Sequence, residues 1–195
     1  MAIRERGAKI VAIDVYMNAT MKQADMALLV KPGTDVALMN GLLAWCDAEG
    51  ITDPAFLGDH VNAAEGFWEH IRTGHDLWTT AKTCDIAPAL LEQFYKLFAA
   101  TPRTVTMFSQ GINQSIRGTD QVNAIINLHL ATGRIGKPGA APFSITGQPN
   151  AMGGREVGGL ANLLSAHREL ANPEHRAEVA RLWGVPEVPS TPGKT

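Results

Sequence analysis

Short apolar runs alternate with longer helical segments in this chain, and this alternation limits the possible folds more than any other feature. The runs KIVAID (residues 9–14) and ALLV (27–30) have the length and apolar character of buried parallel strands. A third run, RTVTMF (103–108), is rich in the β-branched residues typical of strands. Strands that alternate with helices predict an α/β fold with a parallel sheet.

Helix start and stop signals follow these strands. Thr34 and Thr119 are predicted to cap helices that end before Gly50 and Gly133. Asp53 is predicted to cap a third helix, with Pro54 in its first turn. The helices expected in this region are residues 35–49, a short one from 54, 88–100 and 119–132. We therefore expect residues 1–135 to form one doubly wound, mainly parallel, Rossmann-like α/β domain.

Glycine and proline are concentrated in residues 133–159, which hold eight of the 19 glycines and three of the 11 prolines. So many breakers predict a long, irregular loop. Loops of this length are usually functional or disordered, and the few charges argue against simple disorder. Asn172 and Pro173 then predict a helix that ends near Trp183. We expect residues 136–195 to form this Gly-rich loop and a C-terminal helical extension.

Composition and charge exclude several classes of protein. The 195 residues are 45% hydrophobic and 18% charged, with a net charge of -2, which argues against disorder, nucleic-acid binding and a membrane surface. No apolar run is long enough to cross a bilayer. Cys46 and Cys84 lie outside any CxxC pattern, so we expect free, buried thiols in a cytoplasmic protein. The six histidines lack metal-ligand spacing, and His129 is expected to be a packed or surface residue.

Two acidic residues follow the first two predicted strands. Asp14 ends the first strand, where an acid can bind ribose hydroxyls or simply cap the next segment, and both alternatives remain open. The turn KPGTD places Asp35 in the first turn of a helix. A carboxylate there can accept hydrogen bonds from guanine N1–H and N2–H and so select guanine over adenine. Taken alone, the motif favours the alternative of ordinary helix capping.

Two further segments carry candidate binding residues. SQGINQSIRGTD (109–120) offers Gln110 and Gln114 after a strand, which suits a ligand rich in ring nitrogens and carbonyls, although a polar loop needs no ligand. In GAAPFSITGQPNAMGGREVGG, Arg155 and Glu156 are the only charged residues. Arg155 can attract an oxyanion or pair with Glu156, and the residues alone leave both open.

The order of these segments resembles the molybdopterin oxidoreductases of the dimethyl sulfoxide reductase family over nearly the whole chain. KPGTDVALMNGLL is similar to the family's nucleotide-binding segment, and FSQGINQSIRGTDQVNAIINLHLATG to its pterin-contacting strand, loop and helix. TGQPNAMGGREVGGLANLL and NPEHRAEVARLWGVP resemble assimilatory nitrate reductases in particular. The chain departs from formate dehydrogenases at Thr146, where they have arginine, and Asp14-Val15-Tyr16 replaces the family's usual Asp-Pro-Arg.

Carried over residue by residue, the resemblance implies a site for Mo-bis(molybdopterin guanine dinucleotide). Contacts with the guanosine end of one cofactor are implied for Asp14, Val15, Tyr16, Met17, Asn18, Gly33, Thr34 and Asp35. Gln110 and Gln114 would lie beside its pterin, and Gln148 near the other pterin. Arg155 matches an arginine near the substrate funnel.

The resemblance also implies that the chain is an internal fragment of a larger multidomain subunit that reduces nitrate to nitrite. Its molybdenum ligand and its [4Fe-4S] cluster would come from missing domains of the same subunit, and the fragment alone would be inactive. Electrons would arrive from a flavoprotein or ferredoxin in the cytoplasm. The alternatives are a free-standing guanine-nucleotide or pterin-binding module, and an oxidoreductase of the same family that acts on formate or another oxyanion.

Overall fold

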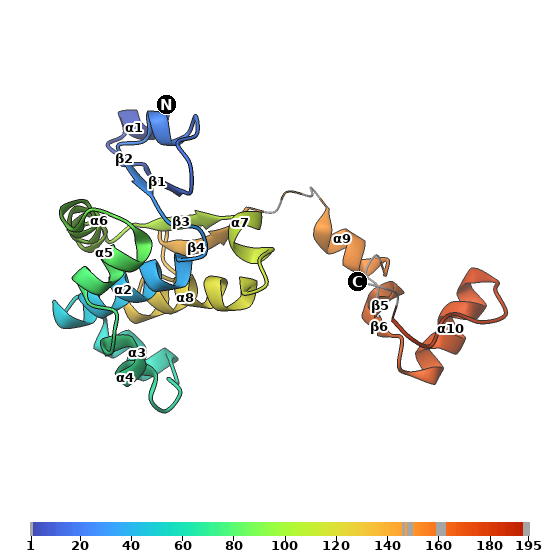
Figure 1. The fold of residues 1–195 in the computed structure, drawn as a ribbon. Helices are drawn as coiled ribbons and strands as arrows, with labels where there is room; N and C mark the ends of the chain where they lie inside the picture. Colours follow the sequence, from blue (N-terminus) through green and yellow to red (C-terminus); the bar gives the residue numbers. More distant parts are fainter. Residues whose placement is uncertain (1, 146, 148–149, 159–162, 193–195) are drawn as a thin grey trace. The chain divides into compact units, whose positions relative to one another are not determined.

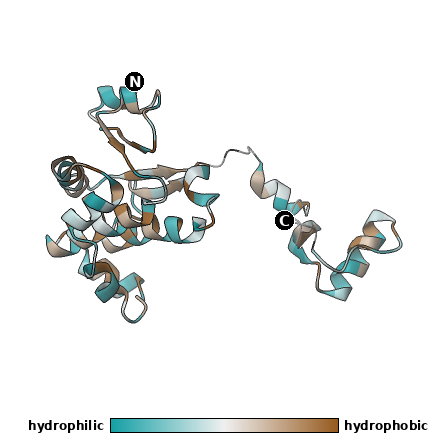
Figure 2. Ribbon diagram, viewed as in Figure 1, coloured by the Kyte–Doolittle hydropathy of each residue, from teal (hydrophilic) through white to brown (hydrophobic). Residues whose placement is uncertain are grey.

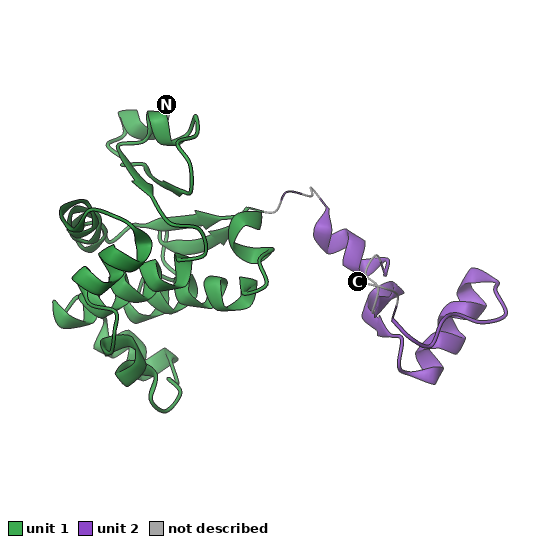
Figure 3. Ribbon diagram, viewed as in Figure 1, with its two compact units in different colours: residues 1–145 green, residues 146–195 purple. Residues whose placement is uncertain are grey.

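The computed structural model describes residues 2–145, 147, 150–158 and 163–192 and forms two compact units, residues 1–145 and 146–195 (Figures 1 and 3). The first unit contains the strands and helices expected of an α/β domain. The second is a small unit with its own core. Each unit is described separately below.

The first unit holds two pairs of parallel strands. β1 (Val11–Asp14) pairs with β2 (Met26–Leu29), and β3 (Val105–Phe108) pairs with β4 (Ala141–Ser144) (Figure 1). The α/β class is therefore confirmed. No hydrogen-bonded ladder joins the two pairs within the described residues, so the single doubly wound sheet is not confirmed. Each of these strands has one edge without a strand partner there.

The helices of the first unit lie around these strands, and all of them except the exposed α1 contribute side chains to one hydrophobic core (Figures 1 and 2). They are α1 (Ala2–Glu5), α2 (Asp35–Ala48), α3 (Pro54–His60), α4 (Phe67–Arg72), α5 (Leu77–Cys84), α6 (Pro88–Ala100), α7 (Gln110–Asn113) and α8 (Gly118–Ala131). Helices α2 and α8 lie side by side. Fully buried residues of α2, α6 and α8, such as Leu42, Tyr95 and Leu128, form the centre of this core. The bounds predicted for α6 are confirmed.

Two predicted helix caps are wrong in their chemistry. Thr34 occupies the N-cap position of α2, but its hydroxyl donates to the Lys31 carbonyl at 2.6 Å and accepts no helix N–H. Helix α8 begins at Gly118, before Thr119. A side chain at Gly118 has no space, because an added Cβ would lie 2.9 Å from the carbonyl carbon of Asn113. The close approach of the Asn113 backbone therefore requires glycine at the first residue of α8.

The β3–β4 pair has one covered face and one exposed face. On the covered face, Thr106 contacts His129 of α8 through a 2.7 Å hydrogen bond. On the other face, Met107 and Phe143 are register partners. We call this second surface the open apolar face; its side chains are Val105, Met107, Phe143 and Ile145, which are 46%, 59%, 52% and 44% exposed. Within unit 1, nothing described covers it.

The prediction of one irregular loop over residues 136–159 is wrong at two described segments. β4 forms there despite Pro142, because an edge strand loses no ladder bond when one N–H on its free side is missing. α9 (Ala151–Glu156) forms because the Asn150 side chain accepts a hydrogen bond from Gly153 N at 3.1 Å. A count of glycines does not capture either local arrangement.

The second unit packs one helix against a short hairpin. β5 (Leu163–Leu164) and β6 (Arg168–Glu169) are antiparallel and enclose the 3-10 turn η2 (Ser165–His167). The predicted helix is confirmed as α10 (Pro173–Trp183), and Arg168 forms a two-point ion pair with its Glu178 at 2.7 and 2.9 Å. The buried side chains of this unit are Leu164, Leu170, Val179, Ala180 and Val188.

Candidate functional site

The carboxyl ends of β1 and β2 meet at one edge because the two strands are parallel. Asp14 is the last residue of β1, and Val30 N donates to its carbonyl at 3.1 Å. The segments that follow the two strands, which carry Asp14 and Asp35, therefore leave from the same edge of this pair. In open α/β sheets, ligands gather outside such carboxyl ends.

The Asp14 carboxylate organises the turn that follows β1. It accepts hydrogen bonds from Val15 N at 2.7 Å and from Asn18 Nδ2 at 2.6 Å. These bonds favour the role of a turn acid for Asp14. The same turn leaves Val15, Tyr16 and Met17 exposed at 50%, 65% and 45%, so an apolar patch is presented beside the edge.

The loop that carries Gly33, Thr34 and Asp35 is anchored to the end of α5. Lys31 N donates to the Cys84 carbonyl at 2.9 Å, and the Cys84 thiol donates to the Thr34 carbonyl at 3.7 Å. Gly33 has a φ of +78°, a left-handed conformation that favours glycine. These contacts fix the point where α2 begins, and therefore the position of Asp35.

A chain of hydrogen bonds connects Asp35 to the loop after β3. Ser115 Oγ donates to Gln121 Oε1 at 2.8 Å, and Gln121 Nε2 donates to Asp35 Oδ2 at 3.3 Å. Gln121 is 6% exposed, whereas Asp35 is half-buried. Burial of the Asp35 carboxyl raises its pKa above the usual range. Two of the segments predicted to bind one ligand are thus brought together by residues of the chain itself.

The two predicted pterin contacts lie on the short helix after β3. Gln110 begins α7 and Gln114 follows its last residue, and both side chains are exposed. The loop is held to β4 by Ser109 Oγ, which donates to the Ile145 carbonyl at 2.6 Å. The two carboxamides therefore stand on a fixed support and are accessible to a ligand.

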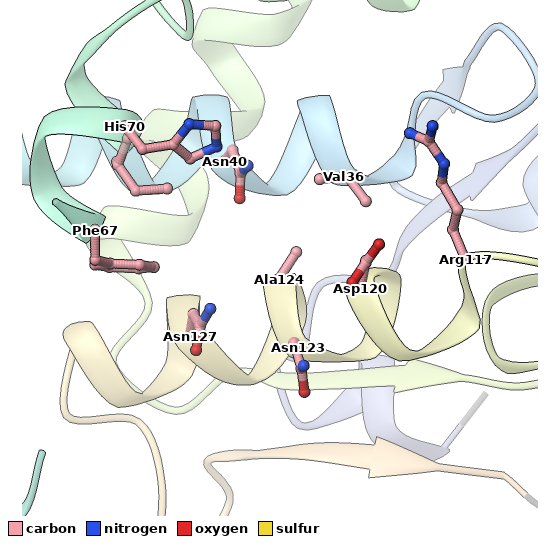
Figure 4. Close-up of a pocket in the computed structure, with 10 residues that line it drawn as sticks. Val36, Asn40, Phe67, His70, Arg117, Asp120, Asn123, Ala124 and Asn127 are labelled. Carbon is pink, nitrogen blue, oxygen red and sulfur yellow. The ribbon is translucent and has the colours of Figure 1, made fainter. Parts of the chain in front are cut away.

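A groove of about 320 Å³ runs between α2 and α8, with α4 at its far end (Figure 4). Arg117 and Asp120 lie at the end where α2 and α8 begin, and Phe67 and His70 lie at the other. Asn40, which is 8% exposed, points into it from α2. At this end the groove is lined by Val36 and Asp120, the sequence neighbours of Asp35 and Gln121.

Arg155 belongs to the second unit. It lies in the last turn of α9 and is exposed. Glu156, the alternative partner considered for it, contacts His167 Nε2 at 2.9 Å. Gln148, the remaining predicted contact, lies outside the described residues.

The metal-ligating capacity of the described chain is small. Within the described ranges, no group of three or more His, Cys, Asp or Glu side chains could hold a metal ion. Cys46 and Cys84 are free and buried, and burial raises the pKa of Cys46 to about 12. In the same described part of the chain, no helix is long and apolar enough to cross a bilayer.

Sequence reasoning missed Gln121 and Ser115. Gln121 is separated from Asp35 by 86 residues, so no local motif joins them. One signal was present: Gln121, Ile125 and Leu128 have the i, i+4, i+7 spacing of one helix face. A lone amide on an apolar face indicates a buried polar contact, because buried amides need hydrogen-bond partners.

Comparison with known proteins identifies the family. The family described as "Molybdopterin oxidoreductase" matches residues 1–195. This chain belongs to that family. A nitrate reductase of Klebsiella oxytoca is 44% identical over 96% of this chain and 21% of its own length. The assimilatory nitrate reductase catalytic subunit of Bacillus subtilis (strain 168) is 36% identical over 93% of this chain and 26% of its own length.

The chain therefore spans about a fifth to a quarter of the length of these relatives. A periplasmic nitrate reductase of Desulfovibrio desulfuricans is 40% identical over 94% of this chain. The chain is therefore similar to both assimilatory and periplasmic nitrate reductases. Among solved structures, acetylene hydratase from Pelobacter acetylenicus matches 72% of this chain with a TM-score of 0.59 and 19% identity. At that identity the match supports the fold alone.

Proposed function

We propose that this chain forms the guanosine end of a Mo-bis(molybdopterin guanine dinucleotide) site in the catalytic subunit of a nitrate reductase. The observation that carries the proposal is the half-buried Asp35 carboxylate, fixed at the start of α2 and joined through Gln121 to the loop after β3. A carboxylate only accepts hydrogen bonds, and guanine offers adjacent N1–H and N2–H donors. Family membership and the similar nitrate reductases support this assignment.

The remaining predicted contacts fit such a cofactor. The turn from Asp14 to Asn18 and the Gly33–Thr34 turn flank the edge from which Asp35 leaves, and Gln110 and Gln114 offer amides for a pterin ring. When bound, the cofactor supplies the two-electron oxygen-atom transfer that converts nitrate to nitrite. The chain's own residues bind and orient it. The molybdenum ligand and a [4Fe-4S] cluster would come from other parts of the subunit.

We further propose that the two strand pairs are parts of one doubly wound sheet. In the strand order 3-2-1-4-5-6, strands 2 and 3 are neighbours and strands 4 and 5 are neighbours. The pairs β1–β2 and β3–β4 have this pattern, with a first strand between β1 and β3 supplied by the longer protein. The order then reverses between that first strand and β3, beside Ser109, which is where ligands bind in such sheets.

Arg155 is proposed to guide nitrate toward the metal. Its guanidinium is exposed, and its neighbour Glu156 is engaged by His167. A planar guanidinium binds planar oxyanions at two points. Electrons would come from a flavoprotein or ferredoxin. A cytoplasmic location is proposed as well, and similarity to an assimilatory catalytic subunit supports it. Gln148 is proposed to lie near the second pterin.

The guanine assignment is tested with Asp35→Asn in the cofactor-free full-length subunit. Calorimetric titration with guanosine diphosphate should show an affinity at least about tenfold lower, because a charge-assisted hydrogen bond is lost and the new amide presents a donor to guanine. Asp59→Asn, at an exposed position of α3, is the matched control. An unchanged affinity in the Asp35 variant would remove the basis of the proposal.

The substrate assignment is tested in the full-length enzyme with Arg155→Lys and Arg155→Ala. Nitrate turnover per molybdenum should fall in both, and by about tenfold or more in the alanine variant. Turnover with formate in place of nitrate would identify the other oxidoreductase, and absence of turnover with tight nucleotide binding would identify a free-standing module. Unchanged kcat/KM per molybdenum in Arg155→Ala ends the guidance hypothesis.

A further inference from the structure

The side chain of Gln121 is held at both ends. Its Oε1 accepts a hydrogen bond from Ser115 Oγ at 2.8 Å, and its Nε2 donates to Asp35 Oδ2 at 3.3 Å. It is 6% exposed and lies in the first turns of α8, next to the beginning of α2. The residue therefore links two helix starts through one carboxamide.

The direction of this carboxamide is determined by Asp35. An ionised carboxylate only accepts hydrogen bonds, so the amide nitrogen of Gln121 faces Asp35. Its Oε1 then faces Ser115 Oγ, which donates to it. The opposite orientation would place two acceptor oxygens against each other beside a half-buried carboxylate, which is unfavourable.

The contact with Gln121 restricts rotation of the Asp35 carboxylate. The χ2 torsion of an aspartate has a broad, roughly two-fold energy profile, so an isolated carboxylate turns easily. A two-point contact with guanine needs both oxygens in the plane of N1–H and N2–H. A donor bound to Oδ2 fixes that plane before a ligand arrives and removes the entropic cost of ordering it.

We infer that Gln121 is a positioning residue that orients the Asp35 carboxylate for two-point recognition of guanine, so that it sets the preference for the exocyclic 2-amino group. This inference rests on the proposed function, because it requires the Asp35 carboxylate to accept hydrogen bonds from guanine. Gln121 itself touches no ligand. Replacement of Gln121 should therefore weaken the hydrogen bond between the Asp35 carboxylate and the 2-amino group of guanine, which depends on the plane of that carboxylate.

The test uses two nucleotides that differ only in the 2-amino group. The cofactor-free full-length subunit is titrated with guanosine diphosphate and with inosine diphosphate, which lacks that amine. The unaltered protein should prefer guanosine diphosphate by about tenfold. In Gln121→Leu the preference should shrink to about twofold, while the affinity for inosine diphosphate stays the same. Gln93→Leu, at an exposed position of α6, is the matched control and should keep the full preference.

Each outcome decides between the proposals. If Gln121→Leu lowers the affinity for both nucleotides equally, Gln121 is merely structural and the inference is overturned. An unchanged preference for guanosine diphosphate in this variant overturns it as well. Asp35→Asn is measured alongside: an unchanged preference there refutes the proposed function itself. If Gln121→Leu does not fold, Ser115→Ala serves instead, because it keeps the glutamine but frees its amide to rotate. The preference of Ser115→Ala for guanosine diphosphate should fall between that of the unaltered protein and the twofold preference expected of Gln121→Leu. An undiminished preference in Ser115→Ala overturns the inference.

Discussion

His129 should make the stability of the first unit sensitive to acid. It has no exposed surface, and its Nδ1 lies 2.9 Å from the Arg134 carbonyl. A carbonyl only accepts, so Nδ1 carries the proton, and Nε2 accepts from Thr106 Oγ1 at 2.7 Å. The neutral ring satisfies both neighbours. Burial lowers the pKa of His129 below its usual value of 6.5, and the nearby Arg134 cation acts in the same direction.

The sign and size of the effect follow from proton linkage. The unfolded chain has a histidine pKa of about 6.5, whereas the folded value is lower, so between these values the unfolded state binds more protons. The contribution is complete above pH 6.5 and is lost as the pH falls toward the folded pKa. Between pH 7.5 and 5.5, the free energy of unfolding should fall by up to about 1.4 kcal/mol on this account.

The assay is urea unfolding at both pH values, with tryptophan fluorescence as the signal. A Trp183→Phe background leaves only reporters in the first unit. His129→Gln should lower stability at pH 7.5 by about 1–3 kcal/mol, because buried hydrogen bonds are disturbed, and should lose the pH dependence that His129 causes. His60→Gln, on an exposed part of α3, controls for loss of an imidazole. If His129→Gln and the unaltered chain lose equal stability on acidification, the reasoning is refuted.

Three further predictions concern packing, capping and reactivity. Gly41→Ala should destabilise the chain by about 1–3 kcal/mol in urea unfolding, because an added Cβ would lie 2.7 Å from the buried Tyr95 hydroxyl; normal stability would contradict the packing. Asp53→Ala should cost about 1 kcal/mol, since its carboxylate accepts from Phe56 N at 3.0 Å; Asp53→Asn should retain most of the stability. Cys46 should resist alkylation at pH 8 until urea unfolds the chain, because it is buried and its pKa is about 12; rapid labelling of the native chain would be inconsistent.

Local signals in the sequence located the four longest described helices, α2, α6, α8 and α10, but not the shorter α4, α5, α7 and α9. Pro88 and Pro173 mark the first residues of α6 and α10, because proline fits the first helical turn, and Gly184 ends α10 with a φ of +67°. Such signals act over a few residues and are visible in one dimension. The same reasoning failed for Thr34, whose hydroxyl donates to the Lys31 carbonyl and makes no capping hydrogen bond with a helix N–H.

The failures share a physical cause, which is dependence on distant partners. β4 forms because β3 provides its hydrogen-bonding partner. The two strands are more than 30 residues apart in sequence, roughly the length of a βαβ unit. The candidate site divides in the same way: Asp35 was found from its turn and helix start, but Gln121 reaches it only in the folded chain. The site residues that could be predicted are those with a local geometric requirement, such as Gly33.

The open apolar face has a practical consequence for anyone who handles the isolated chain. Four large apolar side chains are exposed on a strand pair whose outer edges have no strand partner among the described residues. Exposed edges beside an apolar surface favour strand addition between molecules and hence aggregation. A purified sample should therefore aggregate faster as the protein concentration is raised. A lysine at position 107 would protect the chain by placing a charge at the centre of this face.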